Sequence, residues 1–293
     1  MDMLRRDPRS ATFRFATATA ALTLSALSLA SCDQKEPAAN TADVPAAAPA
    51  DANETAAPVV PLPLPPLTRS DIVSAATQAA SSFAQGEASP ASDPLVGRNF
   101  AIRIPFGCTG PTVAEASATE GSGLPVWSWS ADHKAIQLRM TPSDWTDSAL
   151  LAKAGAPDTW EAVEGFWLPR PWLLAETCPA VQADPLQTGA PPASPQTIGL
   201  AAAFEKGGSR LGRRNGRAYE HSIRGEGDAA PTPPAAGFRM RLEGRIASYP
   251  SGRAIECSAS GPDQRPVCIV AIRLDRVAYE DAEGATLSEW RPG

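Results

Sequence analysis

Two glutamates, three positions apart and beside a group of tryptophans, are the residues of this chain best suited to acid–base chemistry. Glu161 and Glu164 could act as the acid and the carboxylate of a glycan hydrolase, a reaction whose paired carboxylates leave no short motif. Serine-nucleophile motifs do not occur, because Gly207-Gly208-Ser209-Arg210-Leu211 departs from G-x-S-x-G at its last position and S-x-x-K is absent. A hydrolase using acidic residues is therefore the alternative interpretation, and a non-catalytic protein is the preferred one.

Tryptophans are concentrated in the middle of the chain. Six of the seven fall within a short stretch: Trp127, Trp129, Trp145, Trp160, Trp167 and Trp172. Their rings could stack on sugars in a glycan or peptidoglycan groove, or they could fill the core, where aromatic side chains dominate burial. We favour the core, and we expect Trp127 and Trp129 to share one strand face as the pair most able to form a binding platform.

A group of arginines is the second candidate binding feature. Arg210, Arg213, Arg214 and Arg217 crowd one glycine-punctuated turn, with Lys206 nearby. Such a cluster could bind anionic headgroups or an acidic partner. The alternative is that these arginines form the solvated tip of a hairpin.

Metal and cofactor sites are not predicted. The two histidines, His133 and His221, stand far from any cysteine, and the sequence has no C-x-x-C pair. Phosphate-cradling loops and metal-binding helix motifs are also missing from the sequence. We therefore expect surface histidines, no metal and no cofactor.

The N-terminal residues have the pattern of an export signal. Residues 1–14 are basic, and Phe15 to Ala30 carry no charge, a length typical of a signal-peptide apolar region and short of a membrane-spanning helix. The segment ends in Leu29-Ala30-Ser31-Cys32, which resembles the lipobox of bacterial lipoproteins. The resemblance implies that residues 1–31 are removed and that the Cys32 thiol carries a diacylglyceryl group. The alternative is an ordinary secretory signal with a chance cysteine at its end.

This resemblance also implies a location. Several acyl chains, such as palmitate, anchor a protein stably, so we expect a membrane-anchored protein of the bacterial cell envelope that faces the periplasm. Asp33 leaves the choice between inner and outer membrane open.

The chain that remains after removal of the signal peptide is acidic. The full chain has 26 basic and 32 acidic residues, and residues 1–31 contain four arginines and two aspartates, so 22 basic and 30 acidic residues remain. An acidic chain of this kind argues against nucleic-acid binding.

Four cysteines remain after Cys32. An even number in an exported chain predicts disulfides, and the four residues Cys108, Cys178, Cys257 and Cys268 allow three pairings. We favour Cys257–Cys268 and Cys108–Cys178, because the first pair flanks a hairpin-like turn.

Residues 32–67 are expected to be a disordered tether. Eighteen of residues 33–67 are Ala or Pro and none is aromatic. A stretch of this composition cannot bury enough apolar surface to offset its conformational entropy. The folded domain is therefore predicted over residues 68–293.

Local patterns predict a mostly antiparallel β domain with a few short helices, of the α+β class and stapled by disulfides. A capping box at Thr68 and Asp71 begins a helix that ends before Gly86, and Thr141-Pro142-Ser143-Asp144 predicts the start of a helix that reaches Lys153. Alternating apolar residues predict strands over 100–104, 136–140, 163–168, 198–205, 217–223, 238–242, 253–257 and 268–274. Residues 187–196 are a loop, or a joint between two subdomains.

These features favour an envelope lipoprotein with a non-catalytic binding or scaffold domain. The expected partners are the membrane, through the lipid anchor, and peptidoglycan or another envelope protein. The mature domain resembles no family by its motifs.

Overall fold

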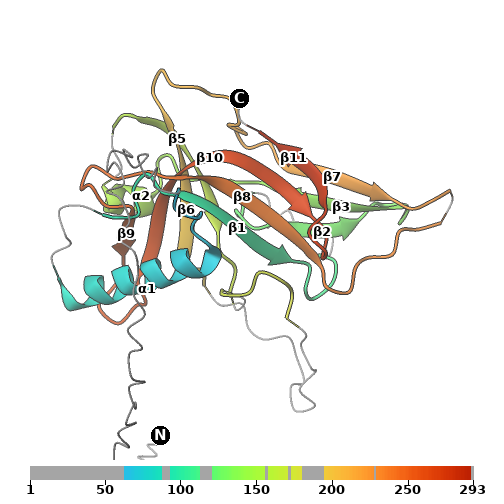
Figure 1. Cartoon of the computed structure of the whole chain (residues 1–293), viewed down its shortest axis with the longest axis horizontal. Helices are drawn as coiled ribbons and strands as arrows, with labels where there is room; N and C mark the ends of the chain where they lie inside the picture. The colour runs from blue at the N-terminus through green and yellow to red at the C-terminus, as the bar shows by residue number, and fades with distance from the viewer. Residues whose placement is uncertain are drawn as a thin grey trace, which may run out of the picture. The chain divides into compact units, whose positions relative to one another are not determined.

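The computed structural model describes residues 63–87, 93–112, 121–155, 158–170, 173–179, 195–227 and 229–291 (Figure 1). The predicted signal peptide, Cys32 and the tether up to residue 62 lie outside these ranges. The described residues form mostly antiparallel sheet with two helices, which confirms the α+β class. None of their helices has the length and apolar character needed to cross a membrane.

One sheet of eight strands dominates the fold. Neighbouring strands along its main path follow the order β1 (Asn99–Phe106), β8 (Phe238–Ile246), β10 (Val267–Glu280), β6 (Ile198–Glu205), β5 (Trp160–Trp167) and β4 (Ser143–Asp144). Two further strands, β9 (Ile255–Ser258) and β11 (Thr286–Trp290), also pair with β10. Only the β6–β10 pair is parallel among these described pairs. In this sheet β8, β10 and β6, which follow residues 187–196 in the chain, lie between β1 on one side and β5 and β4 on the other, which precede those residues. The described residues from 63 onward therefore form one compact unit. Residues 187–194 themselves lie outside the described ranges.

A second, three-stranded sheet adds to the same core. It consists of β2 (Val126–Trp129), β3 (Ala135–Met140) and β7 (Tyr219–Arg224), all antiparallel, and lies at the right of Figure 1. The strands predicted over 198–205 and 217–223 both exist, but β6 belongs to the large sheet and β7 to the small one. The turn between them therefore links two sheets and is not the tip of a hairpin.

Alternation along the strands builds the core. In β1, Phe100, Ile102 and Ile104 are buried, and across the ladder Met240 and Leu242 of β8 face them. In β10 a bulge between Leu274 and Arg276 shifts the pairing with β8 by one residue. Because side chains alternate along a strand, this shift turns the residues that follow it to the other face. The bulge thereby lets Val277 and Tyr279 continue the core that Val270 and Ile272 begin.

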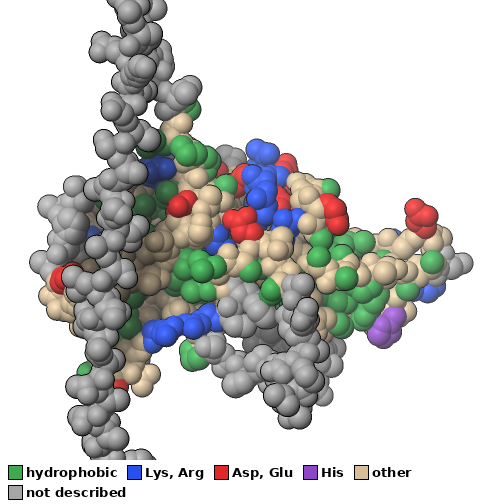
Figure 2. All heavy atoms as spheres, turned by 60° about the horizontal axis from the view of Figure 1, so that its bottom comes forward, with side chains coloured by type: hydrophobic (Ala, Val, Ile, Leu, Met, Phe, Trp, Pro, Cys, Tyr) green, Lys and Arg blue, Asp and Glu red, His purple; other side chains and the backbone are tan. Residues whose placement is uncertain are grey.

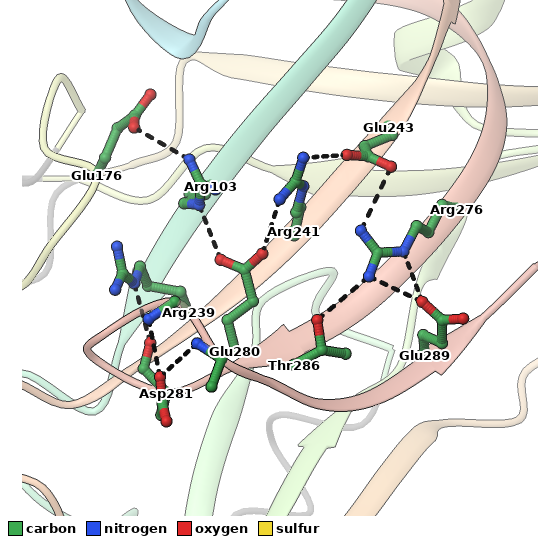
Figure 3. Close-up of polar contacts among 12 residues, drawn as sticks. Arg103, Glu176, Arg239, Arg241, Glu243, Arg276, Glu280, Asp281, Thr286 and Glu289 are labelled. Carbon is green, nitrogen blue, oxygen red and sulfur yellow. Dashed lines mark hydrogen bonds and ion pairs between the residues drawn. The ribbon is translucent and has the colours of Figure 1, made fainter.

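The opposite face of β1, β8 and β10 carries a stripe of ion pairs (Figure 3). Glu280 is fully buried and accepts hydrogen bonds from Arg103 at 2.8 Å and from Arg241 at 3.1 Å. Glu243 then joins Arg241 to Arg276, which also reaches Glu289 of β11. Basic and acidic side chains likewise lie side by side on the face shown in Figure 2.

The two helices begin at side-chain caps. The helix α1 (Arg69–Gln85) starts with the predicted capping box, in which the Thr68 amide donates to Asp71 Oδ2 at 2.7 Å, and it ends at the left-handed Gly86. The second predicted helix was placed too early. Ser143–Asp144 is the strand β4, and α2 (Ala149–Ala154) begins after the cap Ser148. Pairing with β5 overrides the local helix-start signal at this point.

Both favoured disulfides are present. Cys257 of β9 is bonded to Cys268 of β10, and the two residues are direct register partners. Cys108, just after β1, is bonded to Cys178. The end of the predicted tether also belongs to the fold, since Leu67 is buried and its amide donates to the Asn99 carbonyl at 2.8 Å.

Candidate functional site

The candidate site lies at the turn between β6 and β7, which we call the arginine turn (residues 206–218). It contains the four predicted arginines and runs from the large sheet to the small one. Asn215 and Gly216 both have positive φ angles, of 51° and 76°. Glycine and asparagine tolerate this left-handed conformation best, so the Asn-Gly pair permits the sharp reversal that places the arginines.

Glu161 of β5 binds two arginines of this turn. Its Oε1 lies 2.8 Å from Arg210 Nη2 and 3.2 Å from Arg213 Nη1. Glu161 and Arg213 are about three-quarters buried, whereas Arg210 is mostly exposed. The pair with Arg213 is therefore the less screened of the two and contributes more to holding the turn.

Glu164, also on β5, holds the backbone of the turn. Its Oε1 accepts hydrogen bonds from the amides of Arg214 at 2.6 Å and Asn215 at 2.9 Å. The side chain is only 6% exposed, and its Oε2 is buried without a hydrogen-bond partner among the described residues. One oxygen of Glu164 is thus fully engaged, while the other is shielded from both water and protein donors.

The surroundings of Glu164 and Asp144 shift their pKa values in opposite directions. Burial raises the pKa of Glu164, outweighing the opposite effects of the two backbone amides and of Arg213 and Arg214. Hydrogen bonds from Thr146 lower the pKa of Asp144. Asp144 is the register partner of Glu164 across the β4–β5 pair, and both line a pocket of about 300 Å³. Two carboxyl groups with diverging pKa values in one pocket resemble an acid–base pair.

Arg214 connects the turn to the small sheet. Its guanidinium lies 4.7 Å from the centre of the Tyr219 ring and donates to the carbonyls of Arg217 and Ala218. Burial raises the pKa of Tyr219 further above its ordinary value, at which the phenol is already protonated at neutral pH. These contacts therefore fix the Arg214 guanidinium beside the Tyr219 ring and restrict its movement.

The structure brings together residues that the sequence presented as separate features. Glu161 and Glu164 were candidates for hydrolysis, and Arg210, Arg213, Arg214 and Arg217 were candidates for binding. In the structure the glutamates anchor the arginine turn. Asp144 and Tyr219 were not predicted as members, because both join the site through strand pairing. Only the Asn215-Gly216 dipeptide gave a local signal, that of a sharp turn.

The predicted tryptophan platform requires a correction. Trp127 is 3% exposed and belongs to the core, packed against Phe238 and against the backbone of Gly107. Trp129 does share its face, with ring centres 5.7 Å apart, but only Trp129 is partly exposed. The core interpretation is therefore correct for Trp127, whose buried ring cannot stack on a ligand.

Neither histidine joins the arginine turn through a described contact. His133 is exposed in the turn between β2 and β3 and lies beside Trp129, and His221 is half-buried in β7. Burial lowers the pKa of His221. Within the described ranges, no three His, Cys, Asp or Glu residues are grouped so as to hold a metal ion.

Comparisons with known proteins find no similar one: no family model, no curated protein and no solved structure matches this chain.

Proposed function

We propose that this protein is a lipoprotein of the bacterial envelope, anchored through Cys32, whose disulfide-bonded β domain is a non-catalytic binding module. One observation carries the proposal. Glu161 and Glu164, the carboxylates first suspected of catalysis, are engaged in holding a cationic turn on the surface of an acidic chain. An ordered turn loses little conformational entropy on binding, which favours recognition of an anionic partner.

The anchor is tested by lipid labelling. Cells that express the full chain are grown with radiolabelled palmitate, next to cells that express Cys32→Ala. We expect the wild-type chain to carry the label and the Cys32→Ala chain to carry none. Label that persists on the Cys32→Ala chain would overturn the anchor.

The binding role is tested with peptidoglycan, whose stem peptides carry carboxylates. The Cys32→Ala chain, which lacks the thiol proposed to carry the lipid, is co-sedimented with isolated sacculi, and Arg210→Gln with Arg217→Gln is added to the same background. These two side chains are on the exposed part of the arginine turn. Arg139→Gln is the matched control, because Arg139 lies outside the turn and forms an exposed ion pair with Glu220.

Peptidoglycan is supported as the partner if the chain with Arg210→Gln and Arg217→Gln no longer sediments with sacculi, whereas the chain with Arg139→Gln still does. If the chain stays in the supernatant, cross-linking in cells compares the same variants for capture of an envelope protein. Equal behaviour of all variants in both experiments would refute a binding role for the turn.

A hydrolase is the second candidate function, and the opposed pKa shifts of Glu164 and Asp144 favour it. We rank it lower because the unpartnered Glu164 Oε2 is buried, whereas a general acid must reach the proton acceptor. Incubation of the chain with sacculi would release soluble fragments if it hydrolyses them. Release that Glu164→Gln abolishes would favour the hydrolase over the binding module.

A further inference from the structure

A groove borders the arginine turn on the side where the strands of the large sheet separate. The parallel pairing of β6 with β10 ends at Ala202 and Ile272, and the pairing of β11 with β10 begins only at Val277. Residues 203–205 of β6 and residues 273–275 of β10 line the space that opens between these two pairings. The groove has a volume of about 370 Å³, at the lower end of the range for small-ligand sites.

Part of the lining of this groove is apolar. Tyr219 and Trp290 lie edge to face, with ring centres 5.1 Å apart, and Val277 lies beside them in the lining. Leu211, on the arginine turn, also lines the groove and is 62% exposed. An exposed leucine gains free energy when a ligand covers it, because apolar surface is then removed from water.

The rim of the groove is cationic. Four arginines and two carboxylates line it: Arg214, Arg245, Arg273, Arg291, Glu205 and Asp275. Three of the rim arginines form ion pairs, Arg273 with Glu205, Arg245 with Asp275 and Arg291 with Glu289, and all three pairs are exposed on both sides. Exposed pairs of this kind are worth little, so an incoming anion can compete for the arginines without a large cost.

We infer that this groove binds a single amphipathic anion, an alkyl chain that carries a phosphate or carboxylate head. The chain would lie on the accessible apolar side chains of the lining, Leu211, Leu274 and Trp290, and the head would meet the rim arginines. The four arginines exceed by one the three carboxylates that pair with them, Glu205, Asp275 and Glu289, and this excess supplies the charge complementarity. The apolar part of the lining requires a hydrocarbon part that a free inorganic anion lacks. The limited volume favours one amphiphile rather than a polypeptide segment or a bilayer surface.

This inference rests on the proposed binding role of the domain, because it names the ligand class of a groove that the arginine turn borders. It does not depend on the anchor or on peptidoglycan. Loss of palmitate labelling in Cys32→Ala tests the anchor alone, whereas the groove is tested on that unlipidated chain. A failure of the proposed anchor is therefore distinguishable from a failure of the proposed ligand groove.

Titration calorimetry with dodecyl phosphate, below its micelle concentration, tests the groove. The unlipidated chain should bind one equivalent. Leu211→Asp should weaken binding by about tenfold or more, because it removes apolar surface that the chain would cover and places a negative charge beside an anionic ligand. Leu174→Asp is the matched control, since Leu174 is 65% exposed and does not line the groove. This control should bind as the parent does.

Two further arms separate charge from hydrophobicity. Dodecyltrimethylammonium has the same chain with a cationic head and should bind at least about tenfold more weakly than the phosphate. Inorganic phosphate alone should show no binding. The double substitution Arg245→Gln with Arg273→Gln should weaken the binding of dodecyl phosphate, and Arg139→Gln should leave that binding unchanged.

Several outcomes would overturn the inference. Equal affinity for the two alkyl heads, or equal loss in Leu211→Asp and Leu174→Asp, would show non-specific adsorption. Binding of phosphate alone would show a simple anion site. Binding to vesicles of anionic lipid that Leu211→Asp reduces, without binding of monomeric dodecyl phosphate, would assign the groove to a membrane surface instead.

Discussion

The Glu164 carboxylate accepts a 2.6 Å hydrogen bond from the backbone amide of Arg214, although fifty residues separate the two along the chain. This contact ties the arginine turn to β5, the strand of the large sheet that lies between β6 and the edge strand β4. It also makes the position of the turn depend on a buried carboxyl group whose other oxygen has no hydrogen-bond partner among the described residues. The stability of this region should therefore respond to pH.

Glu164→Gln should change how stability varies with pH. Burial raises the pKa of Glu164 above its unfolded value, so in the range just above that unfolded value the folded chain holds a proton that the unfolded chain has lost. The contribution of Glu164 to the free energy of unfolding therefore falls as pH rises through this range. Urea unfolding between about pH 4 and about pH 7 should show wild type losing stability relative to Glu164→Gln. Exposed Glu226→Gln serves as the charge-loss control, and a pH-independent difference for Glu164→Gln would contradict the prediction.

Glu280→Ala should destabilise the fold far more than Glu289→Ala. Glu280 is fully buried between Arg103 and Arg241, whereas Glu289 is partly exposed beside Arg276. Removing Glu280 takes from the partly buried Arg103 and Arg241 their fully buried partner and leaves each with one exposed or partly exposed carboxylate, so we expect a loss of about 3 kcal/mol for Glu280→Ala. For Glu289→Ala we expect a much smaller loss, because water screens the ion pairs of this exposed side chain. Urea denaturation of both variants measures the difference, and equal losses would show that the buried pairs contribute no more than the exposed one.

The two disulfides should stabilise the fold unequally. The Cys108–Cys178 bridge closes a separation of 70 residues and the Cys257–Cys268 bridge one of 11. Loop-closure entropy predicts about 4 kcal/mol for the first and about 3 kcal/mol for the second.

The comparison uses two chains that each retain one bridge. In one chain Cys257 and Cys268 are replaced by alanine, and in the other Cys108 and Cys178 are. Each chain is unfolded in urea before and after reduction, so that the effect of the substitutions cancels. A larger loss on reduction of the short bridge would contradict the loop-length argument.

Gly165→Ala should disturb the packing of β5. A Cβ atom at Gly165 would collide with the ring of Trp145, which lies directly on the glycine. Overpacking of this kind costs about 1–3 kcal/mol. Gly261→Ala is the control, because its Cβ would meet nothing nearer than Gln264 Cγ at 3.8 Å. The control should stay within about 0.5 kcal/mol of wild type in thermal unfolding, and an equally small effect at Gly165 would mean that Trp145 can move aside.

Much of the secondary structure could be predicted because its signals are local. The capping box of Thr68 and Asp71 marks the start of α1, and alternating apolar residues mark β1, β3 and β8. The strand β4 could not be found in this way. It has two residues, and only its pairing with Gly165 and Glu164 makes it a strand.

Solvent exposure was harder to predict than secondary structure. Trp127 and Trp129 alternate as strand residues should, and their rings lie on one face. Whether that face meets the core or the solvent depends on what packs against it. Phe238 of β8 and the backbone of Gly107 cover Trp127, and neither is near it in sequence.

The helix cap, the alternating strands and the even set of cysteines that form two bridges could be predicted, because each depends on residue types and short spacings. The contact of Glu161 and Glu164 with the arginine turn could not, because it arises from long-range strand pairing. That contact requires β5 to pair with β6 and the turn to cross from one sheet to the other. These contacts join residues about fifty positions apart, and no short-range pattern encodes them, because they form only when the two sheets share one core.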